Sequence, residues 1–311
     1  MSTAQPCLKS AVERACGLDK EAFHDRYLSG LGKPVVITDA VSQWRASSKW
    51  SFDWLKSHYK SSNVAPRFWA EINLVRLMKL GDYIDYLDAP VNASSGVWID
   101  PLTNFPCAPP VARRTTPLNL YWNAFSRHPE LLEDLELTPN FVEDWTPLLP
   151  SAVRRVLDQG TKYFSAGLVI GQQGSTSALH YDFLHTHAFL AQIVGKKRCV
   201  LYSPSDTAAM YNGYVDPDRP DFEKFPLLRK ATAFECILEP GDLLFIPCDW
   251  WHHVVALEKS ITVSYNFFNR VNFRAYLTDL LQNVPAVVHS LRVSSQPFGD
   301  HCHRPKSVLR T

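Results

Sequence analysis

Short runs of apolar, β-branched and aromatic residues, separated by turn residues, dominate the chain from Lys162 onward. Each run is bounded by glycine, proline or polar residues, which is typical of β-strands rather than helices. Eight short strands at this spacing predict a mainly β fold, either a sandwich or a double-sheet jelly roll. The runs cover residues 163–170, 177–182, 188–194, 198–202, 233–238, 242–246, 253–257 and 261–268.

The earlier part of the chain predicts helices around two strands. Residues 1–30 are expected to be a helical lead-in, because 19–28 carry apolar positions at helical spacing. A buried strand is expected at 33–39, and a second at 118–122, with Leu118, Leu120 and Trp122 on one face and Asn119 and Tyr121 on the other. Further helices are predicted from 51, with Ser51 as N-cap, at 81–87, within 125–135, at 147–157 and at 274–282.

The 311 residues are expected to form one structural domain with three parts. Residues 1–160 supply helices and strands that flank the barrel, 161–270 form the jelly-roll core, and 271–311 form a C-terminal helix and tail. In that last helix Tyr276, Leu277, Leu280 and Leu281 form an apolar face, which predicts a homodimer.

The chain's most informative stretch is His180-Tyr181-Asp182, because residues two apart in a strand point to the same face. His252, which follows Trp250-Trp251, is the expected third ligand. Two histidines and one carboxylate form a facial triad that leaves positions open on Fe(II), as non-haem oxygenases require. There are two alternatives. The neighbouring His253 is a rival to His252 as third ligand. The His-x-His pair His185 and His187 would ligate a metal, contact substrate or line the rim of the barrel.

Residues 180–270 resemble the JmjC, or cupin-8, family of Fe(II)/2-oxoglutarate dioxygenases. The segments 195–204, 218–226 and 239–247 carry the likeness together with the His-x-Asp and Trp-Trp-His-His motifs. Within the family these segments are similar to the small hydroxylases, such as the hypoxia-inducible-factor asparaginyl hydroxylase and the tRNA wybutosine hydroxylase. The resemblance therefore implies a double-stranded β-helix core that binds Fe(II) and uses 2-oxoglutarate and O₂ as co-substrates.

The same resemblance assigns roles to further residues. His180, Asp182 and His252 correspond to the metal ligands, and Lys197 to the cation for the distal carboxylate of 2-oxoglutarate. Hydrogen bonds to that carboxylate are implied for the hydroxyl groups of Ser177 and Tyr121, and Asn266 corresponds to a residue beside the iron. The chain departs from the family in a longer turn after Asp182 and in Ala188, where related hydroxylases carry asparagine.

One strand supports this site independently of the resemblance. In 261–268 the small polar residues Thr262, Ser264 and Asn266 alternate with Val263, Tyr265 and Phe267. Because polar side chains inside a barrel require partners, a polar interior face indicates a bound metal or oxoacid.

Bulk composition excludes some classes. The 32 basic and 31 acidic residues nearly cancel, so the chain has no large net charge that would attract polyanions, and nucleic acid is an unfavoured partner. Arg113-Arg114 and a basic tail keep nucleic-acid binding as an alternative. Seven cysteines without a Cys-x-x-Cys pair indicate a reducing compartment. With neither a signal sequence nor an apolar run of membrane-spanning length, the expected location is the cytoplasm.

The sequence thus predicts a dioxygenase that hydroxylates an amino-acid side chain in a protein or peptide. The alternatives are a hydroxylase of free amino acids or other small molecules, a tRNA-modifying hydroxylase, and a non-catalytic cupin-like binding protein. A histone demethylase shares the chemistry but usually accompanies chromatin-reading modules, for which the chain has no room.

Overall fold

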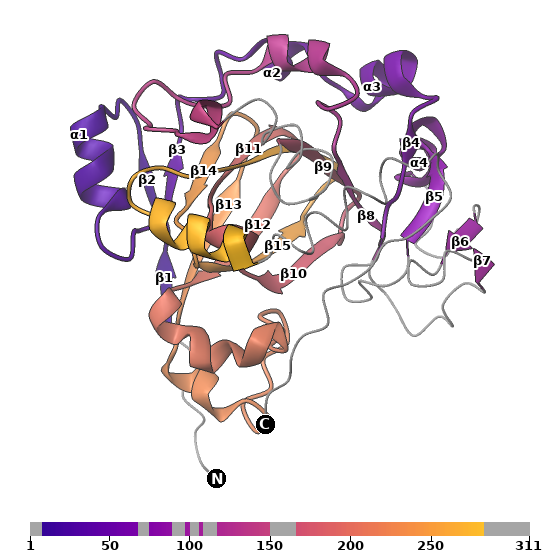
Figure 1. The fold of residues 1–311 in the computed structure, drawn as a ribbon. Coiled ribbons are helices and arrows are strands. Elements are labelled where there is room, and N and C mark those ends of the chain that lie inside the picture. The colour runs from indigo at the N-terminus through magenta and orange to yellow at the C-terminus, as the bar shows by residue number, and fades with distance from the viewer. Residues whose placement is uncertain are drawn as a thin grey trace.

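The computed structural model describes residues 8–67, 75–88, 97–99, 106–107, 117–149 and 166–282. Two β-sheets form its centre and a smaller third sheet lies to one side (Figure 1). The first large sheet runs β1 (Leu8–Ala11), β13 (Thr232–Leu238), β12 (Lys197–Tyr202), β15 (Trp251–Ala256), β10 (Thr176–His180). The second runs β2 (Glu13–Ala15), β3 (Val35–Ile37), β14 (Leu243–Ile246), β11 (His187–Val194), β16 (Ser260–Phe267), β9 (Gly167–Gly171), β8 (Asn119–Trp122). The third runs β4 (Asn63–Val64), β5 (Val75–Lys79), β6 (Val97–Ile99), β7 (Pro106–Cys107).

All eight strands expected from residue 162 onward are present, as β9 to β16. They divide four and four between the two large sheets, with β10, β12, β13 and β15 in one and β9, β11, β14 and β16 in the other. Apart from the parallel pairs β1–β13 and β2–β3, neighbours in both large sheets are antiparallel. The predicted jelly-roll core is therefore confirmed.

The space between the two large sheets holds both apolar and polar side chains. Its apolar part is a cluster to which both sheets contribute: Val36, Ala188, Cys199, Leu201, Leu244, Ile246 and Val254 among others. A second and larger cluster covers the outer face of the β16 sheet, where Val263, Tyr265 and Phe267 pack under the N-terminal helices. The alternation of β16 thus turns Thr262, Ser264 and Asn266 inward, as the sequence predicts.

The helices are short, and most lie on the outside of the sheets (Figure 1). Ser51 caps α3 by accepting a hydrogen bond from the backbone N–H of Trp54, as expected. Among the described residues, no helix is long and apolar enough to cross a membrane. The α-helices are α1 (Lys20–Phe23), α2 (Arg45–Lys49), α3 (Phe52–Tyr59) and α4 (Leu80–Tyr86), and the π-helix η1 (His24–Leu28) continues α1. The 3₁₀ helices are η2 (Pro129–Asp134), η3 (Thr146–Leu148), η4 (Phe183–His185), η5 (Pro204–Gly213) and η6 (Pro226–Lys230), and a last helix covers 273–282.

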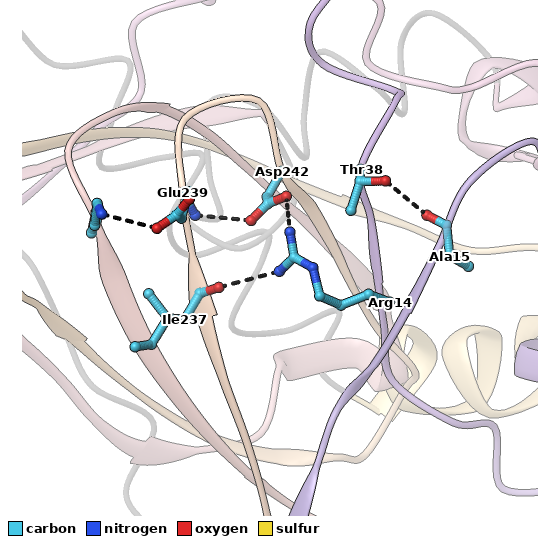
Figure 2. Close-up of polar contacts among 7 residues, drawn as sticks. Arg14, Ala15, Thr38, Ile237, Glu239 and Asp242 are labelled. Carbon is cyan, nitrogen blue, oxygen red and sulfur yellow. Dashed lines mark hydrogen bonds and ion pairs between the residues drawn. The ribbon is translucent and has the colours of Figure 1, made fainter.

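The expected helical lead-in is wrong for residues 8–15, which form β1 and β2. Each strand pairs in parallel with a distant strand, β1 with β13 and β2 with β3. Arg14 fixes the second of them, because its Nη2 donates to Asp242 Oδ1 at 2.6 Å and its Nη1 faces the Ile237 carbonyl at 3.5 Å (Figure 2). The helical pattern of 19–28 is confirmed, but tertiary pairing decides the segment before it.

Other expectations fall partly outside the described residues. The helix expected at 147–157 begins as the 3₁₀ turn η3, and 150–157 lie outside the described range. Arg113-Arg114 and the basic tail also lie outside it. In the C-terminal helix, Tyr276 is fully buried in its own chain, where its ring stacks on Phe268, whereas Leu277 and Leu281 are exposed. The face predicted to form a dimer is thus partly covered within the chain itself.

Candidate active site

The pairing of β10 with β15 brings the two candidate histidine ligands together. His180 and His252 are direct cross-strand partners, and their ring centroids are 4.2 Å apart. The register shifts between Ser177 and His180, where three steps along β10 match two steps along β15. Because of this bulge, both Ser177 and His180 face the interior, although an odd spacing would otherwise place them on opposite faces.

Asp182 completes the group from just beyond the strand. β10 ends at His180, so the expectation that His180 and Asp182 share one strand is wrong, but the backbone stays extended at Asp182. Asp182 Oδ1 lies 3.9 Å from His180 Nε2 and 3.9 Å from His252 Nε2. One ligand atom from each of the three residues lies within 4.8 Å of the others.

Backbone carbonyl groups set the orientation of both imidazoles. His180 Nδ1 lies 2.7 Å from the Ala178 carbonyl oxygen, and His252 Nδ1 lies 3.1 Å from that of Trp250. A carbonyl oxygen only accepts, so each Nδ1 carries the proton and each Nε2 presents a lone pair towards Asp182. Burial, with the neighbouring His252, holds the pKa of His180 well below its usual value, which favours the neutral ring that a metal binds. The three side chains therefore fit a divalent metal.

The two sequence alternatives for the metal ligands lie elsewhere. His253 points to the opposite face of β15, where its Nε2 lies 3.1 Å from Asp218 Oδ2, and Asp218 also pairs with Arg198. His187 is buried beside the rings of Phe245 and Phe267. Burial lowers the pKa of His253 to about 4 and that of His187 to about 3, so both are neutral.

His185 lies at the rim and forms a pair with a residue that the sequence analysis did not single out. Its Nδ1 donates to Asp249 Oδ1 at 2.6 Å, and both side chains are somewhat more than one-third exposed. Asp249 precedes the Trp-Trp-His-His motif in the turn between β14 and β15. Its non-glycine backbone has φ of 64°. A polar residue in this turn was the only sequence signal that could have indicated it.

Lys197 is buried at the start of β12 and has the location expected of a carboxylate partner. Its cross-strand neighbours are Ala256 on β15 and Leu238 on β13, so it shares the interior face with Leu201, the neighbour of His252. Ala256 lies four positions after His252 on β15, which corresponds to about 13 Å along the strand. Burial lowers the pKa of Lys197 to about 8. An anion beside this group would stabilise its charged form.

Ser177 and Tyr121 also face the interior, on opposite sheets. Ser177 Oγ accepts a hydrogen bond from Asn119 Nδ2 at 3.1 Å, a contact that sequence reasoning did not predict. Tyr121 lies across β9 at Gly167, where a Cβ atom would come within 2.6 Å of its Cζ atom. Glycine at this position is therefore required for the tyrosine ring to lie over the strand.

Asn266 lies on the interior face of β16, opposite Ala188. Its Nδ2 donates to Thr186 Oγ1 at 3.1 Å, which joins the strand to the loop after Asp182. On the same face Thr262 donates to Gln192 Oε1 at 2.8 Å. The predicted polar face is thus confirmed, with part of its hydrogen bonding satisfied within the chain.

A jelly roll that groups two histidines and a carboxylate in its interior is a cupin fold with a candidate metal site. Residues 20–273 match the family model described as a cupin-like domain, and the chain belongs to this JmjC-like family.

Curated relatives extend the comparison. The chain is 26% identical over 285 residues to lysine-specific demethylase JMJ21 of Arabidopsis thaliana, a match that covers 86% of this chain and 26% of the relative. It is 41% identical over 108 residues to tRNA wybutosine-synthesizing protein 5 of Gallus gallus, covering 33% of each. Identity to lysine-specific demethylase 8 of Xenopus tropicalis is 27% over 290 residues, covering 85% of this chain and 56% of the relative. The matches thus span between about a quarter and just over half of these relatives.

Proposed function

We propose that the protein is an Fe(II)/2-oxoglutarate-dependent dioxygenase that hydroxylates an amino-acid side chain in a protein or peptide. The observation that carries this proposal is the grouping of His180, Asp182 and His252, with both Nε2 atoms directed at one carboxylate and both Nδ1 atoms tied to backbone carbonyls. A donor set of two imidazoles and one carboxylate leaves sites for a co-substrate and O₂. When bound there, iron supplies the oxidative decarboxylation of 2-oxoglutarate to succinate and CO₂ with hydroxylation of a C–H bond.

The remaining residues bind and orient the co-substrate. The Lys197 ammonium group pairs with the distal carboxylate of 2-oxoglutarate in an interior where either charge alone would be costly. The Ser177 hydroxyl, positioned by Asn119, and the Tyr121 hydroxyl donate hydrogen bonds to the same carboxylate. Asn266 holds the loop after Asp182 through Thr186 and thereby fixes the wall beside the metal ligands.

The choice of a protein or peptide substrate follows the likeness to small hydroxylases and the near-neutral charge of the chain. The relatives are named for different substrates, lysine demethylation in two cases and tRNA wybutosine synthesis in the third. Free amino acids, other small molecules and tRNA are therefore separate arms of the test.

The test is succinate release from 2-oxoglutarate by the iron-loaded protein in the presence of peptide, amino-acid or tRNA pools. Mass spectrometry of the pools then identifies any product that is heavier by one oxygen atom. We expect stimulation by peptides, and none by any pool in a His180→Ala variant. Stimulation by free amino acids or tRNA alone would contradict the proposed protein or peptide substrate. Release of formaldehyde with a demethylated product would show demethylation in place of the proposed hydroxylation. A wild-type protein that binds iron but releases no succinate with any pool would favour a binding-only cupin.

A further inference from the structure

The segment His185-Thr186-His187 connects the surroundings of two metal ligands. It ends the loop that joins β10 to β11 and contains Asp182, and it contacts the turn between β14 and β15, which precedes the strand that carries His252. None of the three residues belongs to the metal-ligand group, yet each one bonds to a neighbouring element: His185 and His187 to that turn, and Thr186 to β16.

Two of these bonds reach the turn between β14 and β15. His185 Nδ1 donates to Asp249 Oδ1 at 2.6 Å, and the Cys248 backbone N–H donates to Nδ1 of His187, the first residue of β11, at 3.0 Å. The third bond runs from Asn266 Nδ2 to Thr186 Oγ1 at 3.1 Å and attaches the loop that contains Asp182 to β16. This loop is therefore attached both to β16 and to the turn that precedes β15, the strand of His252.

The backbone at these contacts is in an uncommon conformation. Leu184, His185 and Asp249 have φ angles of 60°, 51° and 64°, in the left-handed region, which aspartate and histidine adopt more readily than leucine does, so Leu184 is the most disfavoured of the three. Leu184 is buried beside Phe268 and Tyr276, and Asn272 Nδ2 donates to the His185 carbonyl oxygen at 2.7 Å. Strained residues persist where the surrounding structure determines them, and they concentrate at functional sites.

We propose that His185 and Asp249 are positioning residues that hold Asp182 at the correct separation from His252 for a metal to bind. The pair joins the loop that contains Asp182 to the turn that precedes the strand of His252, and it acts through these segments without contacting the metal. This inference builds on the metal centre of the proposed function. In this interpretation the His-x-His segment connects neighbouring elements of the site and does not form an alternative ligand set.

The test measures Mn(II) affinity by calorimetry and the absorption spectrum of the Co(II)-loaded protein, neither of which needs a substrate. Asp249→Gly and His185→Gly remove the side-chain bond, and glycine accommodates the left-handed backbone. Direct hydrogen-bond partners of metal ligands contribute about 10–100-fold to metal affinity, and His185 and Asp249 act one contact further from the ligands, so we expect each variant to bind Mn(II) about 10-fold more weakly and to shift the Co(II) spectrum. Asp249→Asn keeps an oxygen acceptor for His185 and tolerates the same backbone conformation, so it should retain affinity within about threefold of wild type.

A matched control is the pair His24 and Asp25, which is bonded at 2.9 Å between the same atom types, is also accessible to solvent, and lies in η1. His24→Ala should leave Mn(II) affinity and the Co(II) spectrum unchanged. Wild-type affinity in both glycine variants would overturn the proposal, and so would an equal loss in Asp249→Asn and Asp249→Gly. A wild-type protein that binds Mn(II) but shows no turnover of 2-oxoglutarate would refute the proposed function and leave this inference intact.

Discussion

His180 and His252 face each other across the β10–β15 pair, and each ring is oriented by the carbonyl oxygen of the residue two positions earlier. The arrangement points both Nε2 atoms towards Asp182. The candidate centre is therefore a property of two adjacent strands, with the carboxylate supplied by the loop that follows one of them.

We expect the anaerobically purified protein to bind one Fe(II) per chain through His180, Asp182 and His252. Metal analysis of His180→Ala and His252→Ala should show iron content reduced by at least about tenfold, because each change removes one of three protein ligands. His253→Gln is the control, since His253 faces Asp218 on the opposite side of β15. Full iron content in both alanine variants would exclude this assignment.

Lys197→Ala should weaken binding of 2-oxoglutarate by about 1.5–3 kcal/mol, the contribution of a charge-assisted hydrogen bond, or by more if the carboxylate is left buried. Calorimetry with Mn(II) in place of iron measures the difference without turnover. Lys196→Ala is a matched control, because Lys196 is the neighbour of Lys197 in sequence but has a partly exposed side chain that pairs with Glu239. An unchanged dissociation constant in Lys197→Ala would remove this residue from the site.

Binding of 2-oxoglutarate should weaken as the pH rises above about 8. Burial lowers the pKa of Lys197 to about 8, so the ammonium form that pairs with a carboxylate predominates below this pH. Above it the amine must take up a proton on binding, and the dissociation constant should rise by up to about tenfold per pH unit until the pKa of the complex is reached. Titrations between pH 7 and 9.5, compared with Lys197→Ala, check this, since the variant should lack that rise.

Arg14→Ala should lower the free energy of unfolding by about 1–2 kcal/mol. The substitution removes a hydrogen bond to the buried Asp242 carboxylate, whose other oxygen accepts from the Glu239 N–H at 2.9 Å (Figure 2). The estimate is at the low end for a charged bond because the arginine side chain is about half exposed and screened by solvent. Urea unfolding measures the change, and Lys9→Ala, which breaks the exposed pair with Glu235, should cost less than about 0.5 kcal/mol. Equal stability of Arg14→Ala and wild type would show that the pair does not hold β2 in place.

We expect the homodimer predicted from the C-terminal helix to depend on Leu277 and Leu281, the two apolar residues of that helix face that stay exposed. Light scattering of the wild-type protein at micromolar concentration should give a dimer. Leu281→Glu should give a monomer, whereas Thr278→Glu on the neighbouring polar surface should remain dimeric. A wild-type monomer under these conditions would rule the dimer out.

The sequence by itself determined the strands of the core and the identity of the three grouped side chains. Strand formation in β9 to β16 follows from local alternation and turn residues, and alternation also separates His252 from His253 and turns Thr262, Ser264 and Asn266 inward. These features depend on neighbours a few residues apart, and such spacing is visible in one chain.

Only the tertiary structure decided the features that depend on distant partners. Residues 8–15 became strands because β13 and β3 offer them backbone hydrogen bonds, and Arg14 meets Asp242 across 228 positions. The bulge that turns Ser177 inward depends on the register of β10 against β15, and the bond between His185 and Asp249 spans 64 positions. Local propensity carries no information about such pairings, since their free energy is gained only when the sheets and loops have assembled.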